Sequence, residues 1–246
     1  MTVLVGVKCT DGVVIGADSA ATSAAGQIHL LKMASDKIEI IGNRVIVAGT
    51  GQIGLGQRFA SVVSDAHNAK LFQGKRIDVA RQLAAAAVKD FAATGAGKAQ
   101  YGALVAAPIE DDACLIEFGI VDFQPEIKTK KLNFVVMGSG QMLAEPFVSF
   151  VARTFWQSEM PDVQSAIFGV HWALAHTIRC APGGVGDPIV IATLTKQKKG
   201  WCAEMLSEEM LGEQAQHMAA IEEVIANYKE KLLEDVDATA PPKLDQ

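Results

Sequence analysis

Hydrophobic and polar positions in the first fifty residues follow the short runs that are typical of antiparallel strands. Residues 2–9 are rich in β-branched and aliphatic side chains, Asp11-Gly12 offers a tight turn, and the apolar pattern resumes at 13–15. This pattern predicts a β-hairpin at the N-terminus. A second hairpin is predicted from residues 37–41 and 44–47, which a Gly-Asn turn separates.

Beyond residue 51 the apolar positions take helical spacing, and pairs of predicted helices alternate with runs of strands. The predicted elements are helices at 52–72 and 77–93, strands at 102–109, 114–121 and 132–137, helices at 141–156 and 162–178, and a strand at 189–194. Antiparallel runs interrupted by helix pairs favour an α+β fold, a four-layer αββα sandwich in which helices flank two antiparallel sheets.

The pattern divides the chain into residues 1–205, one domain without an internal repeat or linker, and residues 206–246. Apolar residues at helical spacing over 207–234 predict a long amphipathic helix, with Ser207 as its N-cap, followed by a tail. Such a helix packs either on its own domain or on a neighbouring subunit, and the sequence leaves both open.

Composition excludes several classes of protein. The chain has 246 residues, of which 50% are hydrophobic and 20% charged, so it can bury a core and is not disordered. Its net charge of −6 argues against non-specific nucleic-acid binding. No apolar run approaches the ~20 residues that a bilayer demands, so no membrane association is expected. The first residues lack a secretory signal, and we expect a cytoplasmic protein.

Metal and cofactor sites are not predicted. The cysteines are scattered and form no C-x-x-C motif, which is typical of small buried side chains in a reducing compartment. His171 and His176 are five residues apart, which is not the spacing that places two ligands on one helix face. We therefore expect neither a bound metal nor another cofactor.

A glycine-rich stretch at 49–54 matches G-x-G-x-x-G after a predicted strand. Dinucleotide binding requires a following helix, a second parallel strand and an acidic residue at the end of that strand. Here a second helix follows the first, so nucleotide binding is not favoured. A second stretch, Gly138-Ser139-Gly140, predicts a tight turn between a strand and a helix.

Thr2 is the most informative residue for chemistry. Initiator methionine is normally removed before a small residue, which would leave a threonine with a hydroxyl and a free α-amine. An amine with a reference pKa near ~7.7–8.0 can take the hydroxyl proton near neutral pH. Because many chains begin Met-Thr by chance, the surrounding sequence decides whether this pair has a function.

That surrounding sequence resembles the opening of a proteasome β subunit. Residues 2–22 share its strand-turn-strand and its Ala-Asp-Ser-x-Ala-Thr end. The resemblance continues through 37–41, 48–50 and 138–141, in the order of the family, and covers roughly residues 2–194. In having no propeptide and a long C-terminal helix, the sequence is most similar to the bacterial proteasome homologues.

The resemblance implies the N-terminal-nucleophile (Ntn) hydrolase fold and a threonine-type endopeptidase. In this family Thr2 Oγ would attack the scissile carbonyl and form an ester that water hydrolyses. Lys37 would lower the pKa of the Thr2 amine by like-charge repulsion, and Asp18 would compensate the buried charge of Lys37. The Gly49 N–H would be the oxyanion donor, and Ser139 would orient the amine or a water.

The resemblance also implies positions that bind substrate. Thr22 and Gly51 would hydrogen-bond an extended peptide backbone, as in strand addition. Val47 and Ala21 would line the first specificity pocket, which suggests an apolar preference. The implied substrate is unfolded protein or peptide.

Other interpretations of these residues stay open. Lys32 competes with Lys37, since the segment after Asp18 is longer than the family pattern; Lys37 is preferred because Ile-Glu-Ile-Ile follows it. Without catalysis, Asp18 and Gly49 would be turn residues and Lys37 a solvated charge at a strand edge.

The late part of the sequence departs from the family. In the family, an aspartate and a Ser-Gly just before the last strand of the domain support the threonine amine. In this chain Cys180 and Gly183 take those places. Asp187 or a bound water replaces that support, or activity is reduced.

For assembly, the resemblance implies a homo-oligomer, a double-ring tetradecamer with the active sites inside. Whether an ATPase or adaptor feeds the chamber stays open. Two alternatives remain: a non-catalytic structural ring subunit, and an Ntn amidase that acts on a small substrate.

Overall fold

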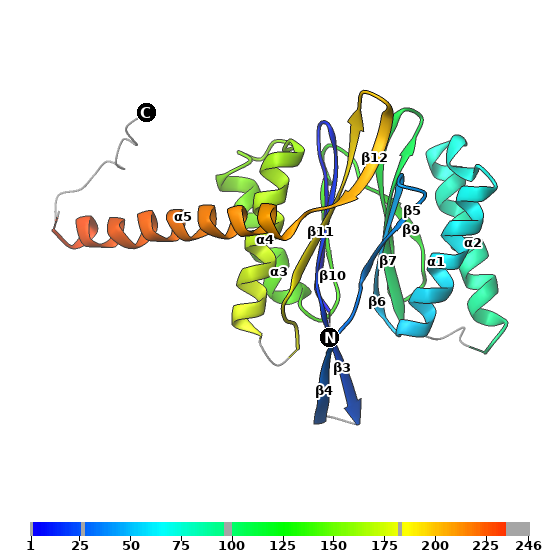
Figure 1. Cartoon of the computed structure of the whole chain (residues 1–246), viewed down its shortest axis with the longest axis horizontal. Coiled ribbons are helices and arrows are strands. Elements are labelled where there is room, and N and C mark those ends of the chain that lie inside the picture. The colour runs from blue at the N-terminus through cyan, green and yellow to red at the C-terminus, as the bar shows by residue number, and fades with distance from the viewer. Residues whose placement is uncertain (1, 26–27, 96–99, 182–183, 235–246) are drawn as a thin grey trace.

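Four layers make up the protein in a computed structural model, with helices on the outside and two β-sheets between them (Figure 1). The structure describes residues 2–25, 28–95, 100–181 and 184–234, and the side chains of 21–25, 28–34 and 230–234 lie outside that description. The predicted α+β sandwich of two antiparallel sheets flanked by helices is therefore confirmed.

The first sheet has the strand order β10-β1-β2-β11-β12, and all its neighbours are antiparallel. Helices α3 and α4 cover its outer face (Figure 1). The bounds are β1 (Leu4–Lys8), β2 (Gly12–Asp18), β10 (Phe134–Met137), β11 (Ile189–Gln197), β12 (Gly200–Met205), α3 (Gln141–Thr154) and α4 (Val163–Cys180).

The second sheet has the order β5-β6-β7-β8-β9, is also antiparallel, and is covered by helices α1 and α2. A separate hairpin of β3 and β4 extends from the end of the sandwich near the N-terminus (Figure 1). The bounds are β3 (Ala20–Ala25), β4 (Ile28–Ala34), β5 (Ile38–Ile41), β6 (Val45–Gly51), α1 (Ile53–Asn68), a 3₁₀ turn (Leu71–Gln73), α2 (Arg76–Ala92), β7 (Tyr101–Ile109), β8 (Asp112–Phe118) and β9 (Pro125–Ile127).

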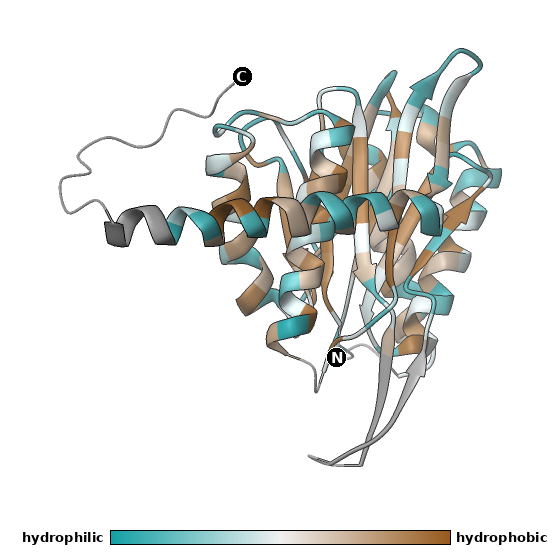
Figure 2. Ribbon diagram, turned by 60° about the vertical axis from the view of Figure 1, so that its left-hand side comes forward, coloured by the Kyte–Doolittle hydropathy of each residue, from teal (hydrophilic) through white to brown (hydrophobic). Residues whose placement is uncertain are grey.

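Burial on both faces explains why these strands are hydrophobic almost throughout. Leu4 packs between the two sheets, whereas Val5 and Val7 on the same strand pack against the outer helices. In β6, Ile46 lies between the sheets and Val45 faces the helices. Side chains alternate along a strand, so the central strands of each sheet contribute to two of the three hydrophobic clusters. The brown, hydrophobic strands lie between the helices in Figure 2.

The turns explain several boundaries. Gly42 and Asn43 have left-handed φ of +57° and +53°, and with Arg44 they form the three-residue turn between Ile41 and Val45, so the predicted β5–β6 hairpin is confirmed. The predicted helix over 52–72 is shorter than expected, because Lys70 is left-handed with φ of +59° and α1 ends at Asn68.

Four strands were not predicted from the pattern: β3, β4, β9 and β12. The six residues of β3 are alanine, serine and threonine, which have no strong strand signal. β9 has only three residues, and β12 follows a polar turn that reads as the end of an element. The strand predicted over 114–121 ends at Phe118.

Helix α5 (Glu208–Glu234) confirms the predicted C-terminal helix, and Ser207 Oγ accepts a hydrogen bond from the Met210 N–H at 3.3 Å, as an N-cap does. Its first half packs on its own domain, where Leu211 and Met218 join the cluster around α4. Glu222 accepts hydrogen bonds from Trp172 and Arg179 of α4. The remainder of α5 extends beyond α4 (Figure 1).

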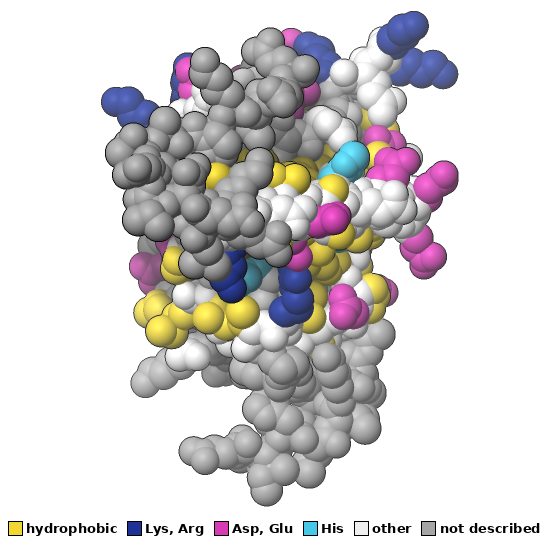
Figure 3. Space-filling model, turned by 90° about the vertical axis from the view of Figure 1, so that its left-hand side faces the viewer, with side chains coloured by type: hydrophobic (Ala, Val, Ile, Leu, Met, Phe, Trp, Pro, Cys, Tyr) yellow, Lys and Arg dark blue, Asp and Glu magenta, His cyan; other side chains and the backbone are white. Residues whose placement is uncertain are grey.

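Hydrophobic side chains are exposed on the same side of the molecule as α5, as Figure 3 shows. Large exposed hydrophobic side chains of α3 and α5 are Met142, Leu143, Phe150, Met210, Val224 and Ile225. Over the described residues, no helix combines the length and the hydropathy that crossing a membrane requires.

We predict that Phe59 is a major source of stability. Its fully buried ring lies edge-on to those of Tyr101, Phe118 and Phe123, at centroid distances of 6.1, 5.3 and 5.1 Å. Phe59→Ala should lower the free energy of unfolding by about 3–5 kcal/mol, measured by urea denaturation. Val121→Ala, at a side chain that is 92% exposed, is the control and should have little effect. Equal effects of the two changes would contradict this assignment of the core.

Candidate active site

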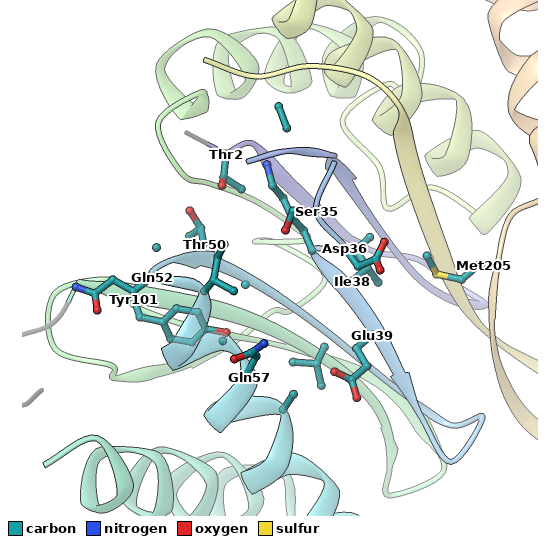
Figure 4. Close-up of a pocket in the computed structure, with 18 residues that line it drawn as sticks. Thr2, Ser35, Asp36, Ile38, Glu39, Thr50, Gln52, Gln57, Tyr101 and Met205 are labelled. Carbon is teal, nitrogen blue, oxygen red and sulfur yellow. The ribbon is translucent and has the colours of Figure 1, made fainter. Parts of the chain in front are cut away.

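A pocket of about 700 Å³ opens at the end of the sandwich where the chain begins (Figure 4). Its walls come from the start of β1, the segment before β5, the end of β6, and α1. Thr2, Lys37, Val47, Gly49 and Gly51 all line it, so the structure brings these candidate residues together. The volume is in the range of pockets that hold small ligands or side chains.

Asp18 lies at the centre of the hydrogen bonds behind this pocket, and its side chain is fully buried. Its Oδ1 accepts from the Val3 N–H at 2.9 Å and from Lys37 Nζ at 2.6 Å. Its Oδ2 accepts from the N–H groups of Ala20 at 3.2 Å and Gly186 at 3.1 Å. The carboxylate therefore ties its own segment, the end of β2, to three others that are distant in sequence, at Val3, Lys37 and Gly186.

Lys37 belongs to the same buried arrangement, since its side chain is only 7% exposed. A buried ammonium group is stable only when a carboxylate and hydrogen bonds compensate it, and Asp18 provides both. Lys37 is thus not a solvated charge at a strand edge. The side chain of Lys32, the alternative lysine, lies outside the described residues.

The nitrogen of Thr2 donates a hydrogen bond to Ser139 Oγ at 3.0 Å. The Thr2 carbonyl oxygen accepts from the Gly140 N–H at 3.1 Å. Gly138 has φ of +95°, and a β-carbon there would lie 2.3 Å from the Thr2 carbonyl oxygen, so only glycine permits this approach. The predicted Gly-Ser-Gly turn thus holds Thr2. In the chain with Met1 attached this nitrogen is an amide, and removal of Met1 would make it an amine.

Gly49 differs from its predicted role in one respect. Its N–H donates to the Lys37 carbonyl oxygen at 3.2 Å, a bond between β5 and β6. An oxyanion donor has to point its N–H at the reacting carbonyl, so this group would have to turn away from Lys37. A β-carbon at Gly49 would lie 2.3 Å from the Tyr101 hydroxyl oxygen, which explains a glycine here on packing grounds.

The pocket is more polar than its predicted residues indicate. Val47 is nearly buried behind it, Gly51 lines it, and the side chains of Ala21 and Thr22 in β3 are outside the described part. The polar residues of the lining that sequence reasoning missed are Ser35, Asp36, Glu39, Thr50, Gln52, Gln57 and Tyr101. Glu39, Thr50 and Gln52 lie in stretches that the sequence singles out for other reasons, and the seven side chains converge only because β5, β6, β7 and α1 pack together.

The late segment contributes to the site through its backbone. Cys180 is the last residue of α4, is exposed, and places Sγ 3.6 Å from His176 Nε2. Gly183 lies outside the described residues, and Asp187 is exposed. This segment contacts the site at Gly186, whose N–H donates to Asp18 at 3.1 Å and whose carbonyl oxygen accepts from the Ser19 N–H at 3.0 Å.

Two antiparallel sheets between helix layers, with a threonine, an aspartate and a lysine at one end, define the Ntn-hydrolase fold. The sequence model described as proteasome subunit matches residues 2–161, more than half of the chain, and the protein belongs to this family. No curated protein matches the sequence.

Solved structures of Anbu proteins are similar over nearly the whole chain. Anbu (ancestral beta-subunit) from Yersinia bercovieri has a TM-score of 0.67 and 12% identity, and the match covers 98% of this chain and 100% of that one. An Anbu (Gly-1) mutant from Hyphomicrobium sp. strain MC1 has a TM-score of 0.69 and 16% identity, with 99% and 100% covered. The Anbu complex of a helical assembly from Pseudomonas aeruginosa has a TM-score of 0.67 and 16% identity, with 98% of each chain covered. At these identities the similarity shows the fold.

We predict that replacing Asp18 lowers the free energy of unfolding more than replacing Lys37, its partner in the buried ion pair. Asp18→Ala leaves the Lys37 ammonium and three backbone N–H groups without their acceptor, and should lower the free energy of unfolding by about 3–5 kcal/mol. Lys37→Met should cost less, because the Asp18 carboxylate keeps those N–H donors and a methionine fills the space. Urea denaturation measures both.

The exposed ion pair of Lys196 and Asp111 provides a matched control, and Lys196→Met should leave stability nearly unchanged. A larger cost for Lys37→Met than for Asp18→Ala would show that Asp18 is not the residue that organises this end of the fold.

Proposed function

We propose that the protein is a threonine-type endopeptidase that hydrolyses peptide bonds through an acyl-enzyme on Thr2, once Met1 is removed. The observation that carries this proposal is that Thr2 shares its pocket with a buried lysine, while its nitrogen already lies 3.0 Å from Ser139 Oγ. A nucleophile, a nitrogen that can act as base and a fixed positive charge are the elements that the chemistry requires.

In the proposed first step the free amine of Thr2 takes the proton from Oγ. Oγ then bonds to the scissile carbonyl carbon, the C–N bond breaks, and the ammonium returns the proton to the leaving amine. The buried charge of Lys37 lowers the pKa of the amine by like-charge repulsion, so the amine is neutral near physiological pH and can act as a base. The hydrogen bond to Ser139 Oγ would keep the Thr2 amine oriented toward Thr2 Oγ.

In the second step water attacks the ester, the amine takes a proton from the water, and the Oγ–carbon bond breaks. Thr2 regains its hydroxyl proton, so the cycle closes with no cofactor. Asp18 acts as a positioning residue, because it holds Lys37 and the start of β1 in place. Gly49 would stabilise the oxyanion after its N–H turns from the Lys37 carbonyl to the substrate, at a bond that is already at the long end of the range.

The substrate backbone would bind as an added strand, with Gly51 and Thr22 as hydrogen-bonding positions and Val47 and Ala21 beside the side-chain pocket.

We further propose a homo-oligomer in which these pockets face an enclosed space, a double-ring tetradecamer. What supports self-association is the α5 helix that extends beyond its own domain, together with exposed hydrophobic side chains on that side of the molecule. Residues 206–246 would then form the assembly segment of the chain.

The test uses Thr2→Ala and, as a matched control, Thr2→Ser in the intact assembly. Thr2→Ala should lower kcat/KM for fluorogenic peptides by about 10³-fold or more, since both the nucleophile and its acyl-enzyme are lost. Thr2→Ser should retain part of the activity because it keeps a hydroxyl and an amine. Size-exclusion chromatography should show the same assembly for both variants.

Unchanged turnover in Thr2→Ala would contradict the mechanism. Turnover of small amides but not of peptides would identify the Ntn amidase instead. A purified chain that keeps Met1 and turns over neither kind of substrate would identify a structural ring subunit.

A further inference from the structure

One end of the pocket carries polar side chains that the proposed mechanism does not use. Tyr101, Gln57 and Glu39 lie there in the view of Figure 4, with Thr2 at the opposite end. They come from three elements: β7, α1 and β5. Since Thr2 marks where a scissile carbonyl would lie, this end is where an adjacent substrate side chain would enter.

The Tyr101 hydroxyl is buried and makes no hydrogen bond with any described residue. Burial raises the pKa of Tyr101, so the phenol stays neutral throughout the physiological range. Buried hydroxyl groups in proteins nearly always have a partner, because an unpaired one loses its hydration without replacement. An unpaired hydroxyl that lines a pocket therefore indicates that a ligand supplies the partner.

Two glycines flank this buried hydroxyl between β6 and α1. A β-carbon at Gly49 would lie 2.3 Å from the Tyr101 hydroxyl oxygen, and one at Gly56 would lie 3.6 Å from it. Both glycines line the pocket. A side chain at Gly49 would displace the hydroxyl, whereas a β-carbon at Gly56 would only come into van der Waals contact with the ring.

The charge of the lining favours a cation. Asp36 and Glu39 are exposed, and neither forms an ion pair within the described structure. Of the described residues in the lining only Lys37 is cationic, and it is bonded to Asp18. The carboxylate of Glu39, the amide oxygen of Gln57 and the lone pairs of Tyr101 can all accept hydrogen bonds.

We propose that this pocket receives the cationic side chain of an arginine or lysine that precedes the scissile bond of an extended peptide. Glu39 is the residue that selects the positive charge, and Gln57 and Tyr101 accept further N–H bonds from it. Val47 contacts the aliphatic stem, so its apolar side chain is compatible with a basic residue. A guanidinium group, with five donors in a plane, suits three separate acceptors best. The inference rests on the proposed function, which places the carbonyl of that residue at Thr2.

The test measures binding without hydrolysis, in the assembled Thr2→Ala protein. Two peptides, identical except for Arg or Leu at the residue before the cleavage position, are titrated by calorimetry. The Arg peptide should bind about fivefold to tenfold more tightly at low salt, and the preference should shrink as ionic strength rises. Glu39→Gln in the same background should abolish the preference, whereas Glu159→Gln, at an exposed position between α3 and α4, should preserve it.

Tyr101→Phe removes only the hydroxyl and separates recognition from a structural role. It should weaken binding of the Arg peptide about threefold to fivefold and leave that of the Leu peptide unchanged. The melting temperature of the unliganded protein should not fall, because the hydroxyl has no partner in the described structure. A fall in melting temperature with unchanged binding would assign the hydroxyl to the fold and overturn its part in recognition.

Equal binding of the two peptides, tighter binding of the Leu peptide, or binding of neither would overturn the proposal. These outcomes are distinct from failure of the proposed function, because the binding measurement needs no turnover. Conversely, a Thr2-dependent peptidase that prefers leucine would keep the function and remove this specificity.

Discussion

The buried ion pair of Asp18 and Lys37 is the constraint on which the rest of the site depends. Moving two charges out of water costs free energy, and their attraction offsets this only with good geometry and further hydrogen bonds. The protein meets that condition by giving Asp18 three backbone N–H donors, from Val3, Ala20 and Gly186. Because each donor belongs to a different segment, the pair can form only when β1, the turn after β2 and the segment before β11 are all in place.

That requirement links folding to chemistry. Asp18 accepts one hydrogen bond from Val3, the residue next to Thr2, and another from Lys37, which lines the same pocket as Thr2. The Gly-Ser-Gly turn before α3 holds Thr2 from the other side. Thr2, the proposed nucleophile, is therefore held by buried backbone and side-chain groups from several segments. Such preorganisation is what a catalytic threonine needs.

Much of the fold could be predicted from local pattern. Hairpins with Asp-Gly and Gly-Asn turns, alanine-rich helices and the capped C-terminal helix have signals within a few residues. The strands β3 and β9 could not, since β3 consists of alanine, serine and threonine and β9 has only three residues; β4 and β12 were also not predicted, although both contain hydrophobic residues. Contacts between distant segments override weak local preference there.

The candidate site divides in the same way. Thr2, Asp18, Lys37 and Ser139 follow from a resemblance that preserves order along the chain, and the structure places them at one end of the sandwich. The hydroxyl of Tyr101 could not be predicted, because its position beside Gly49 depends on the register between β6 and β7. The hydrogen bond from the Gly49 N–H to the Lys37 carbonyl oxygen depends instead on the pairing of β6 with the start of β5.

The measurement that tests the account most directly is the mass of the purified protein before and after treatment with a peptide epoxyketone. This reagent closes a ring on a residue that offers both a hydroxyl and a free α-amine. The account predicts a chain that lacks Met1 and gains one inhibitor, which peptide mapping locates on Thr2. A chain that begins at Thr2 and remains unmodified at saturating reagent would contradict the claim that this threonine is an activated nucleophile.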